Sequence, residues 1–297
     1  MKKIVSILIL IILAGFLFWK FFIAKGGRDE ALPRLYIADQ PNNLDNKENN
    51  KPVENNNPIS DYEKLREKIN DKYKNIIPKI WSETAPGVMT KLDTTDKVLA
   101  MTFDACGSVG DGFDSKLINY LTENKIPATL FISGKWIDKN PENFKTLTQN
   151  PLFEIENHGT NHIPCSISGK SAYNIQGTKN PGEVVDEIEK NAERIETLTG
   201  RKPQFYRDAT TFSDEVCPQI ANDLGEKMVS YSVLGDAGAT YNAAQIKNVL
   251  EKAPAGSIVI AHMNHPEKQT AEGMMAVLPE LQKEGFRFVK LEDYQLK

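Results

Sequence analysis

The chain has 297 residues and a formal net charge of -4, and its basic residues do not gather into a stripe. This balance argues against a nucleic-acid partner. The length allows one or two domains, and about 200 residues suffice for one α/β core. Three cysteines, Cys106, Cys165 and Cys217, are too few for a disulfide framework, so we expect the fold not to depend on one.

The first 25 residues are mostly apolar and carry lysines at their ends. A run of 16 residues, 4–19, follows the start MKK, and FFIA extends it beyond Lys20. This pattern is typical of a signal peptide or a signal anchor, and the two alternatives stay open. We expect the chain to be membrane-anchored or secreted, with its domain in the periplasm or at the cell surface.

Residues 26–58 are predicted to be a disordered linker. The stretch 40–60 holds eight asparagines and three prolines and has little apolar mass to offset the entropy of ordering. Residues 59–96 are predicted to be a helical and extended lead-in, with an amphipathic helix over 59–76 that packs on the domain. The remaining residues, 97–297, form the predicted catalytic domain.

From residue 97 short apolar runs alternate with helical stretches. The expected strands are 98–104, 127–132, 152–157, 204–207, 228–234, 257–262 and 286–290. The expected helices are 114–124, 141–149, 182–199, 213–224, 242–252 and 270–284. The expected helix N-caps are Asp114, Ser213 and Asn242, and the expected stops are Gly200, Gly225 and Gly285. Alternating β and α elements predict a parallel sheet, either closed into a barrel or open and doubly wound.

The four histidines and one aspartate fall at the ends of these strands. His158 and His162 follow strand 152–157, His262 and His265 follow strand 257–262, and Asp104 ends the first strand. In either parallel fold, ligands gather at the carboxyl ends of the strands. We therefore expect these side chains to converge on one rim.

The residue types at this rim suit metal-assisted hydrolysis. His158 and His162 are spaced i, i+4, which on a helical turn suits a divalent metal, although two solvated loop histidines would look the same. Asp104 is a candidate metal ligand or general base, or else a turn-capping residue. His262 is a candidate general acid, or else a structural histidine. His265 precedes a proline and is expected at the rim.

Four short motifs occur in an order that resembles a known family. They are TFDA at 102–105, HGTNH at 158–162, FYR at 205–207 and GSIVIAH at 256–262. Together they resemble the polysaccharide deacetylases, carbohydrate esterase family four, also called the NodB-homology domain, over residues 97–291. The resemblance implies a distorted seven-stranded parallel (β/α) barrel that hydrolyses N-acetyl or O-acetyl groups on sugars. It also implies a metal bound by two histidines and an aspartate, an aspartate base and a histidine acid.

The family roles carry over to only part of the chain. Asp104 matches the base of the usual TFDD motif, and Ala105 stands where the family has a metal ligand. The third ligand stays open between Asp104, water and Cys106. Low metal affinity without a third ligand is a further alternative, and Cys106 could instead be a free buried cysteine. Arg207 matches the arginine of the third motif and is expected to orient carboxylates near the site.

The fourth motif of the family is replaced by the run 234–238. Asp236 in that run is expected either to orient His262 or to contact substrate, or it is a simple turn residue. Tyr206 and His265 are also expected to contact substrate, and the polar loop 163–181 is expected to shape the groove. The candidate sugar-stacking side chains, each of which could instead belong to the core, are Trp136, Tyr173, Tyr206, Phe212 and Tyr241.

The sequence thus predicts a metal-dependent deacetylase with His158 and His162 as metal ligands. Zinc is the expected metal, with cobalt, nickel and manganese as alternatives. The expected substrate partner is an acetylated polysaccharide such as peptidoglycan or an N-acetylglucosamine polymer. The N-terminus is expected to contact the membrane. The rival predictions are a non-catalytic carbohydrate-binding envelope protein on a degenerate deacetylase fold, and a different metal-dependent hydrolase.

Overall fold

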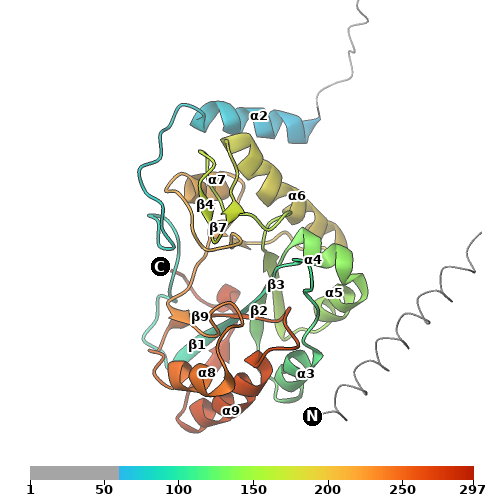
Figure 1. Ribbon diagram of the computed structural model, residues 1–297, viewed down its shortest axis with the longest axis vertical. Coiled ribbons are helices and arrows are strands. Elements are labelled where there is room, and N and C mark those ends of the chain that lie inside the picture. The colour runs from blue at the N-terminus through green and yellow to red at the C-terminus, as the bar shows by residue number, and fades with distance from the viewer. Residues whose placement is uncertain (1–59) are drawn as a thin grey trace, which may run out of the picture. The chain divides into compact units, whose positions relative to one another are not determined.

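A curled parallel sheet organises the part of the chain that the computed structural model describes, residues 60–297 (Figure 1). Its strands are β1 Val98–Ala105, β2 Ala128–Ile132, β3 Phe153–Asn157, β6 Phe205–Tyr206, β7 Lys227–Met228, β8 Val233–Leu234, β9 Ser257–His262 and β10 Arg287–Val289. Seven of them run in the order β7-β6-β3-β2-β1-β9-β8, and β10 pairs with the start of β1. The expected parallel barrel is confirmed as a curled half-barrel.

One expected strand, 228–234, was wrong, because the structure has two short strands there. β7 pairs with β6 at one end of the sheet, and β8 pairs with β9 at the other. Between them Ser230 N donates to Met89 O, and Ser232 N donates to Ile258 O. The chain therefore crosses from one sheet edge to the other within a few residues, which requires a curled sheet and excludes an open one.

The helices alternate with the strands as predicted, apart from one helix start and one additional helix. They are α2 Asp61–Tyr73, α3 Ser115–Glu123, α4 Gly134–Lys139, α5 Pro141–Thr148, α6 Pro181–Thr199, α7 Cys217–Asp223, α8 Ala243–Leu250 and α9 Thr270–Lys283. Asp114 and Asn242 accept from their N3 N–H groups and cap α3 and α8 as expected. The expected cap at Ser213 was wrong, because α7 starts later and Asp214 accepts the N–H groups of Val216 and Cys217. Helix α4 was not foreseen.

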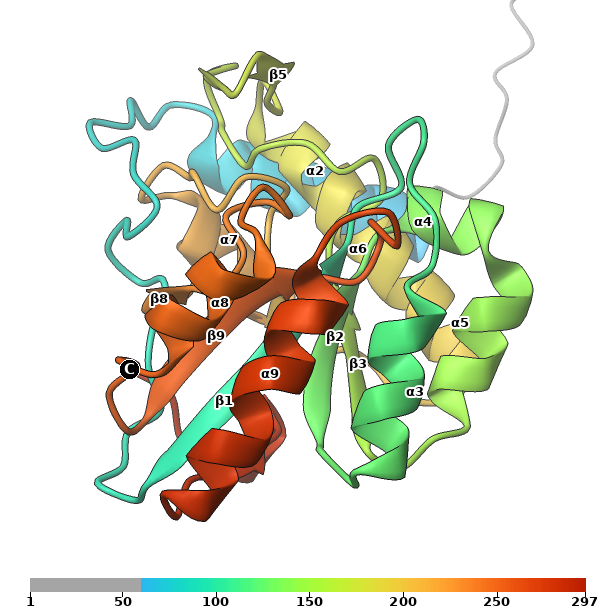
Figure 2. The same cartoon turned by 60° about the horizontal axis from the view of Figure 1, so that its bottom comes forward.

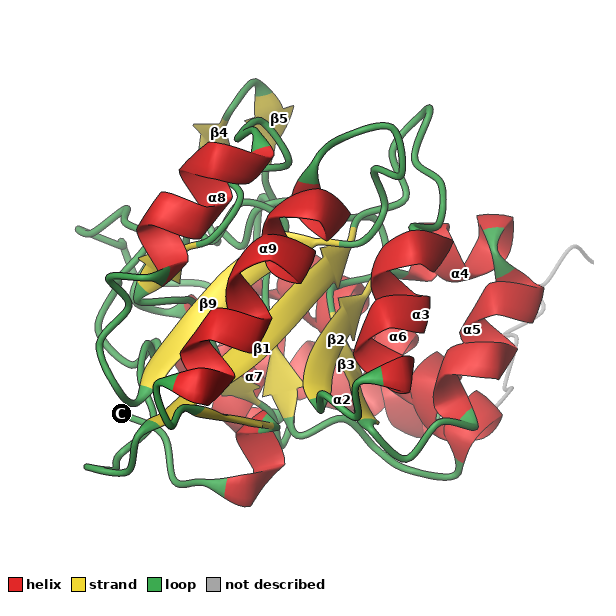
Figure 3. Ribbon diagram, turned by 90° about the horizontal axis from the view of Figure 1, so that it is seen from below, coloured by secondary structure: helices red, strands yellow, loops and turns green. Residues whose placement is uncertain are grey.

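The central strand β1 is buried on both faces. Leu99, Met101 and Phe103 face the apolar layer under α3 and α9, which cover the outer side of the sheet (Figures 2 and 3). Side chains alternate along a strand, so Thr102 and Asp104 point to the inside of the curl. This alternation places a carboxylate at the carboxyl end of the strand, inside the barrel.

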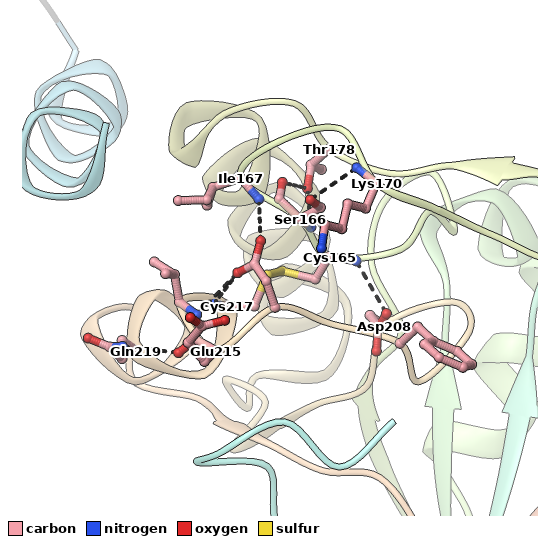
Figure 4. Close-up of a disulfide and its surroundings, with 12 residues drawn as sticks. Cys165, Ser166, Ile167, Lys170, Thr178, Asp208, Glu215, Cys217 and Gln219 are labelled. Atoms are coloured by element: carbon pink, nitrogen blue, oxygen red, sulfur yellow. Dashed lines mark hydrogen bonds between the residues drawn. A yellow bond between two sulfur atoms is a disulfide. The ribbon is translucent and has the colours of Figure 1, made fainter. Parts of the chain in front are cut away.

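Two segments outside the sheet complete the fold. Helix α2 packs on α6, and its Ile69 and Tyr73 are buried in an apolar cluster. The loop 163–181 contains a small hairpin, β4 Ser171–Ala172 with β5 Ile175–Gln176, where an irregular loop was expected. A disulfide joins Cys165 in this loop to Cys217 at the start of α7 (Figure 4). The sequence did not predict this pairing.

The membrane segment expected at residues 1–25 and the linker expected at residues 26–58 lie outside the described residues. Within residues 60–297, no helix combines the length and the apolar character needed to cross a bilayer.

Candidate active site

Asp104, His158, Arg207 and His262 meet at the carboxyl ends of four strands of the same sheet, β1, β3, β6 and β9. Asp104 lies opposite His262 in the β1–β9 pairing. His158 and Arg207 each follow the residue at which β3 pairs with β6. The sheet order therefore brings together side chains that lie up to about 160 residues apart in the sequence.

Arg207 holds Asp104 in place through a buried ion pair. Arg207 Nη1 lies 2.8 Å from Asp104 Oδ1, and the two side chains are 0% and 3% exposed. The same guanidinium donates to Thr102 Oγ1 at 2.8 Å and to Ser230 O at 3.0 Å. Burial alone would raise the pKa of Asp104, but nearby positive charge, above all that of Arg207, outweighs it and lowers the pKa. Asp104 is therefore ionised at neutral pH.

His158 points its Nε2 atom into the site because its other nitrogen is bonded to the backbone. His158 Nδ1 lies 2.8 Å from Arg207 O, and a carbonyl oxygen can only accept, so Nδ1 carries the proton. His158 Nε2 then offers its lone pair at 3.7 Å from Asp104 Oδ2 and 3.8 Å from Cys106 Sγ. This is the tautomer that a metal-ligating histidine needs.

The loop that carries both histidines is irregular, so the expected helical turn was wrong. His162 has a φ of 54°, and Gly159 has a φ of 78°. Buried Glu187 of α6 stabilises this loop, because its carboxylate accepts the N–H of Asn161 at 2.9 Å and that of Ile163 at 3.3 Å. A Cβ on Gly159 would lie 2.4 Å from Glu187 Oε1, so only glycine fits there.

The residues around His162 fit a divalent metal. His162 Nε2 is buried and has no hydrogen-bond partner among residues 60–297, which is costly for a polar atom. The ligand atoms of Cys106, His158 and His162 all lie within 4.8 Å of one another. Burial lowers the pKa of both histidines, so they are neutral at neutral pH and able to ligate. Two imidazoles beside a thiol and a carboxylate form a donor set suited to zinc or cobalt.

His262 is held in its charged form by Asp236. His262 Nδ1 lies 2.9 Å from Asp236 Oδ1, and the backbone N–H of His262 donates to Asp236 Oδ2 at 2.8 Å. Burial would lower the pKa of His262, but the charge of Asp236 outweighs it and raises that pKa well above its usual value. Asp236 is itself fully buried, so its position favours orientation of His262 over substrate contact.

Several residues expected to contact substrate lie elsewhere. Tyr206 is fully buried in the apolar cluster under α2 and α7, so the expectation that it binds substrate is corrected. Trp136 is fully buried against Phe113 and cannot stack on a sugar. His265 lies at the rim, 3.7 Å from Asp111. Tyr241 packs against the main core.

A cleft of about 620 Å³ opens beside Asp104 and His262. Tyr173 of the β4–β5 hairpin lines it, together with Glu83 of the lead-in and Tyr231 of the β7–β8 link. Glu83 accepts from the hydroxyl of Tyr231 at 3.2 Å and from that of Tyr173 at 3.4 Å. Sequence reasoning missed Glu83 and Tyr231, since neither lies in a motif or at the end of a long strand.

The comparison with protein families agrees with this geometry. Residues 91–229 match the family model described as polysaccharide deacetylase. Residues 91–229 are therefore similar to the polysaccharide deacetylase family. The family contains carbohydrate deacetylases that act on amide bonds and is generally metal-dependent.

Similar proteins of the polysaccharide deacetylase family include a peptidoglycan-N-acetylglucosamine deacetylase of Bacillus cereus. It is 25% identical over 214 residues, which cover 69% of this chain and 92% of that protein. The crystal structure of the Bc1960 peptidoglycan N-acetylglucosamine deacetylase superposes with a TM-score of 0.58 at 24% identity, over 69% of this chain and 91% of the other. These likenesses establish the shared fold.

The polysaccharide deacetylase fold also occurs without activity. The structure of BA3943 from Bacillus anthracis, a family four pseudoenzyme, superposes with a TM-score of 0.59 at 18% identity, over 78% of this chain and 81% of the other. The fold alone therefore does not decide between an enzyme and a binding protein, and the decision has to come from the site.

Proposed function

We propose that the chain is a metal-dependent deacetylase that removes acetyl groups from an N-acetylated cell-envelope polysaccharide such as peptidoglycan. The observation that carries the proposal is the charge arrangement across the cleft. An ionised carboxylate, Asp104, and a protonated imidazole, His262, lie beside the pair His158 and His162. Groups whose pKa values are pushed apart in this way are typical of a base and an acid that act in one reaction.

His158 and His162 would hold the divalent metal, with zinc as the first candidate and cobalt, nickel and manganese as alternatives. When bound, such an ion polarises a carbonyl and lowers the pKa of water. A buried imidazole nitrogen without a partner, His162 Nε2, supports this assignment.

The side chains of the chain itself divide the proton transfers. Asp104 takes a proton from the attacking water as the water oxygen bonds to the acetyl carbon. His262 donates a proton to the sugar nitrogen as the carbon–nitrogen bond breaks, so that acetate and a free amine leave. Arg207 positions Asp104 and keeps it ionised, and Asp236 keeps His262 protonated and correctly turned.

The substrate would lie in the cleft lined by Tyr173, Tyr231 and Glu83. Aromatic rings and hydroxyl groups at a cleft wall suit the apolar faces and hydroxyls of sugars. Tyr173 is 71% exposed and sits at the tip of the hairpin, which leaves its ring open to a ligand. His265 is proposed to contact the glycan farther along the rim.

An extracytoplasmic location fits the disulfide between Cys165 and Cys217, since such bonds persist in oxidising compartments. The membrane part of this proposal rests on residues 1–25, which lie outside the described residues.

The test is metal content and acetate release measured on the same samples. The purified chain, loaded with zinc, is incubated with peptidoglycan and with N-acetylglucosamine oligosaccharides, and both acetate and new amines are quantified. His158→Ala and His162→Ala are expected to lose metal and activity, whereas His262→Ala is expected to lose activity and keep metal. Equal metal loss in all three variants would contradict the assigned roles.

A second candidate, a glycan-binding protein without activity, is favoured by one observation. Ala105 occupies the position at which the family has a metal-binding aspartate. Glycan binding without acetate release from a zinc-loaded sample would support this candidate and exclude the deacetylase.

A further inference from the structure

Ala105 has no side-chain atom that can bind a metal, and the residue that follows it carries a sulfur atom. Ala105 belongs to the apolar cluster that contains Phe103 and Trp136, on the face of β1 opposite to Asp104. The next side chain, Cys106, lies on the site side, with its Sγ atom 3.8 Å from His158 Nε2. The donor that the strand end supplies beside Asp104 is therefore a sulfur atom.

The backbone around Cys106 fixes this sulfur in place. Ser133 Oγ donates to Cys106 O at 2.6 Å. The chain then turns at Gly107, whose φ is 82° and where a Cβ would lie 2.4 Å from Trp136 N. Only glycine can make this close approach, so the position of Cys106 is determined by the turn that follows it.

The distances among these ligand atoms fit tetrahedral coordination of a zinc ion. Zinc–sulfur and zinc–nitrogen bonds of about 2.3 and 2.0–2.1 Å in a tetrahedron place the two ligand atoms about 3.6 Å apart. The observed separation of Cys106 Sγ and His158 Nε2 is 3.8 Å. His162 completes the trio within 4.8 Å, and its Nε2 is the buried atom without a partner.

The surroundings do not suit an ordinary core cysteine. Cys106 is only 8% exposed, yet it lies in none of the three apolar clusters of residues 60–297. By contrast, the disulfide-bonded Cys165 and Cys217 both lie in the cluster under α2. The Cys106 thiol is hydrogen-bonded to the imidazole of His158. Its neighbour is therefore a polar group that can share a metal ion, and not the apolar side chains that surround a core cysteine.

We propose that Cys106, as a thiolate, is the third protein ligand of the metal, with His158 and His162. The inference rests on the proposed metal-dependent function. It leaves both oxygens of Asp104 free of the metal, so that one stays on Arg207 and the other can act as base. A soft thiolate also sets the metal preference, which becomes zinc or cobalt over manganese or magnesium.

Cobalt substitution tests the ligand directly, without any acetylated substrate. The chain has three cysteines and two are joined in the disulfide, so Cys106 is the one thiol that can ligate. The Co²⁺-loaded full chain is expected to show thiolate-to-cobalt charge-transfer absorption in the near ultraviolet. Cys106→Ser is expected to abolish that absorption and to weaken zinc binding by more than the roughly 10–100-fold that loss of an outer partner costs.

A second variant keeps the test valid if Cys106→Ser folds poorly. Cys106→Asp supplies a carboxylate and is expected to retain visible cobalt absorption while losing the charge-transfer band. Protection of the Cys106 thiol from iodoacetamide by Zn²⁺ is the third expected result.

Identical cobalt spectra of the native chain and Cys106→Ser would overturn the proposal. Alkylation that proceeds equally fast with and without Zn²⁺ would do the same, and would favour a nucleophilic thiol. If the charge-transfer band appears but no acetate is released, the deacetylase function fails and the ligand assignment stands.

Discussion

Each of the two proposed proton-transfer residues forms an ion pair with a buried partner that favours its charged form. Arg207 pairs with Asp104, and Asp236 pairs with His262. Neither Arg207 nor Asp236 needs to touch the substrate in order to affect the rate of the reaction. The charges of the base and the acid therefore depend on residues that a search for reactive groups alone would pass over.

The ion pair makes Asp104→Asn a test of activity, stability and zinc binding at once. Activity is expected to fall by roughly 10²–10⁴-fold, the usual contribution of a positioned base. The free energy of unfolding is expected to fall by about 3 kcal/mol, since Arg207 keeps a buried charge without its counter-charge. Zinc content should persist, because both imidazoles remain. Acetate release, urea unfolding and zinc content measure the three effects, and full activity would refute the role of Asp104.

Asp208 is expected to make the folded protein less stable as the pH rises. Burial raises the pKa of Asp208 to about 8, although the N–H of Cys165 and other backbone donors oppose this (Figure 4). Between about pH 4 and pH 8 the folded protein holds a proton that the unfolded chain releases, so stability falls as pH rises. The contribution is fully present below about pH 4 and is lost above about pH 8.

Asp208→Asn cannot ionise and is therefore expected to lose less stability between pH 5 and pH 8 than the native chain. Urea unfolding of both proteins, with metal removed by a chelator, measures the difference. Some slope will remain, because burial also raises the pKa values of Glu156 and Glu226 well above normal. Parallel slopes in the two proteins would show that Asp208 is ionised in the fold.

At the residue scale, the sequence predicted the positions that end long strands. Asp104, His158 and His262 follow clear apolar runs, so their convergence could be inferred from topology alone. Tyr206 could not be placed correctly, because a two-residue strand does not show which face is buried. Cys106 stayed one of three alternatives, since only the turn at Gly107 determines where its side chain lies.

At the scale of elements, helix α6 supports the histidine loop. Glu187 lies on its first half and accepts N–H groups from the loop between His158 and Cys165. Asn191, one turn further, donates to Ile132 O and to Asn157 Oδ1 at the ends of β2 and β3. The helix therefore fixes both the strand ends and the loop that follows them.

Glu187→Gln is expected to weaken metal binding by roughly 10–100-fold, the usual effect of losing an outer partner of a metal site. The amide keeps one oxygen and loses the second acceptor oxygen that the loop N–H groups share. Zinc titration of the purified variant measures the change. Glu196→Gln is the matched control, since Glu196 is exposed on the same helix and is expected to bind zinc as the native chain does. Equal affinity in both variants would show that the loop holds its shape without the carboxylate.

Most elements could be predicted from the sequence, and the misses have physical causes. The run 228–234 reads as one strand, yet it divides because the sheet must close on itself between β7 and β8. The disulfide was missed because Cys165 and Cys217 are 52 residues apart, and only the packing of loop 163–181 on α7 brings them together.

At the scale of the whole molecule, the lead-in segment before residue 97 packs as part of the domain. Helix α2 contributes Ile69 and Tyr73 to a buried cluster, and Arg66 pairs with Asp186 of α6 at 3.0 Å. Further along the lead-in, Glu83 reaches the cleft and Met89 pairs with β7. The segment therefore joins the outer layer, the sheet edge and the substrate cleft.

Two truncations separate the lead-in from the residues before it. Removal of residues 1–58 is expected to leave cooperative unfolding, zinc content and acetate release unchanged, because Ser60 and its capping contacts with Glu63 remain. Removal of residues 1–75 also deletes Ile69 and Tyr73, which are 2% and 3% exposed. Loss of one large buried side chain costs about 2–5 kcal/mol, so this variant is expected to lose at least several kcal/mol of stability. Thermal and urea unfolding of both variants, compared with the full chain, measure the difference. Aggregation of the shorter deletion, with loss of cooperative unfolding, would place part of the folding unit before Ser60, whereas equal stability of both variants would show that α2 is dispensable.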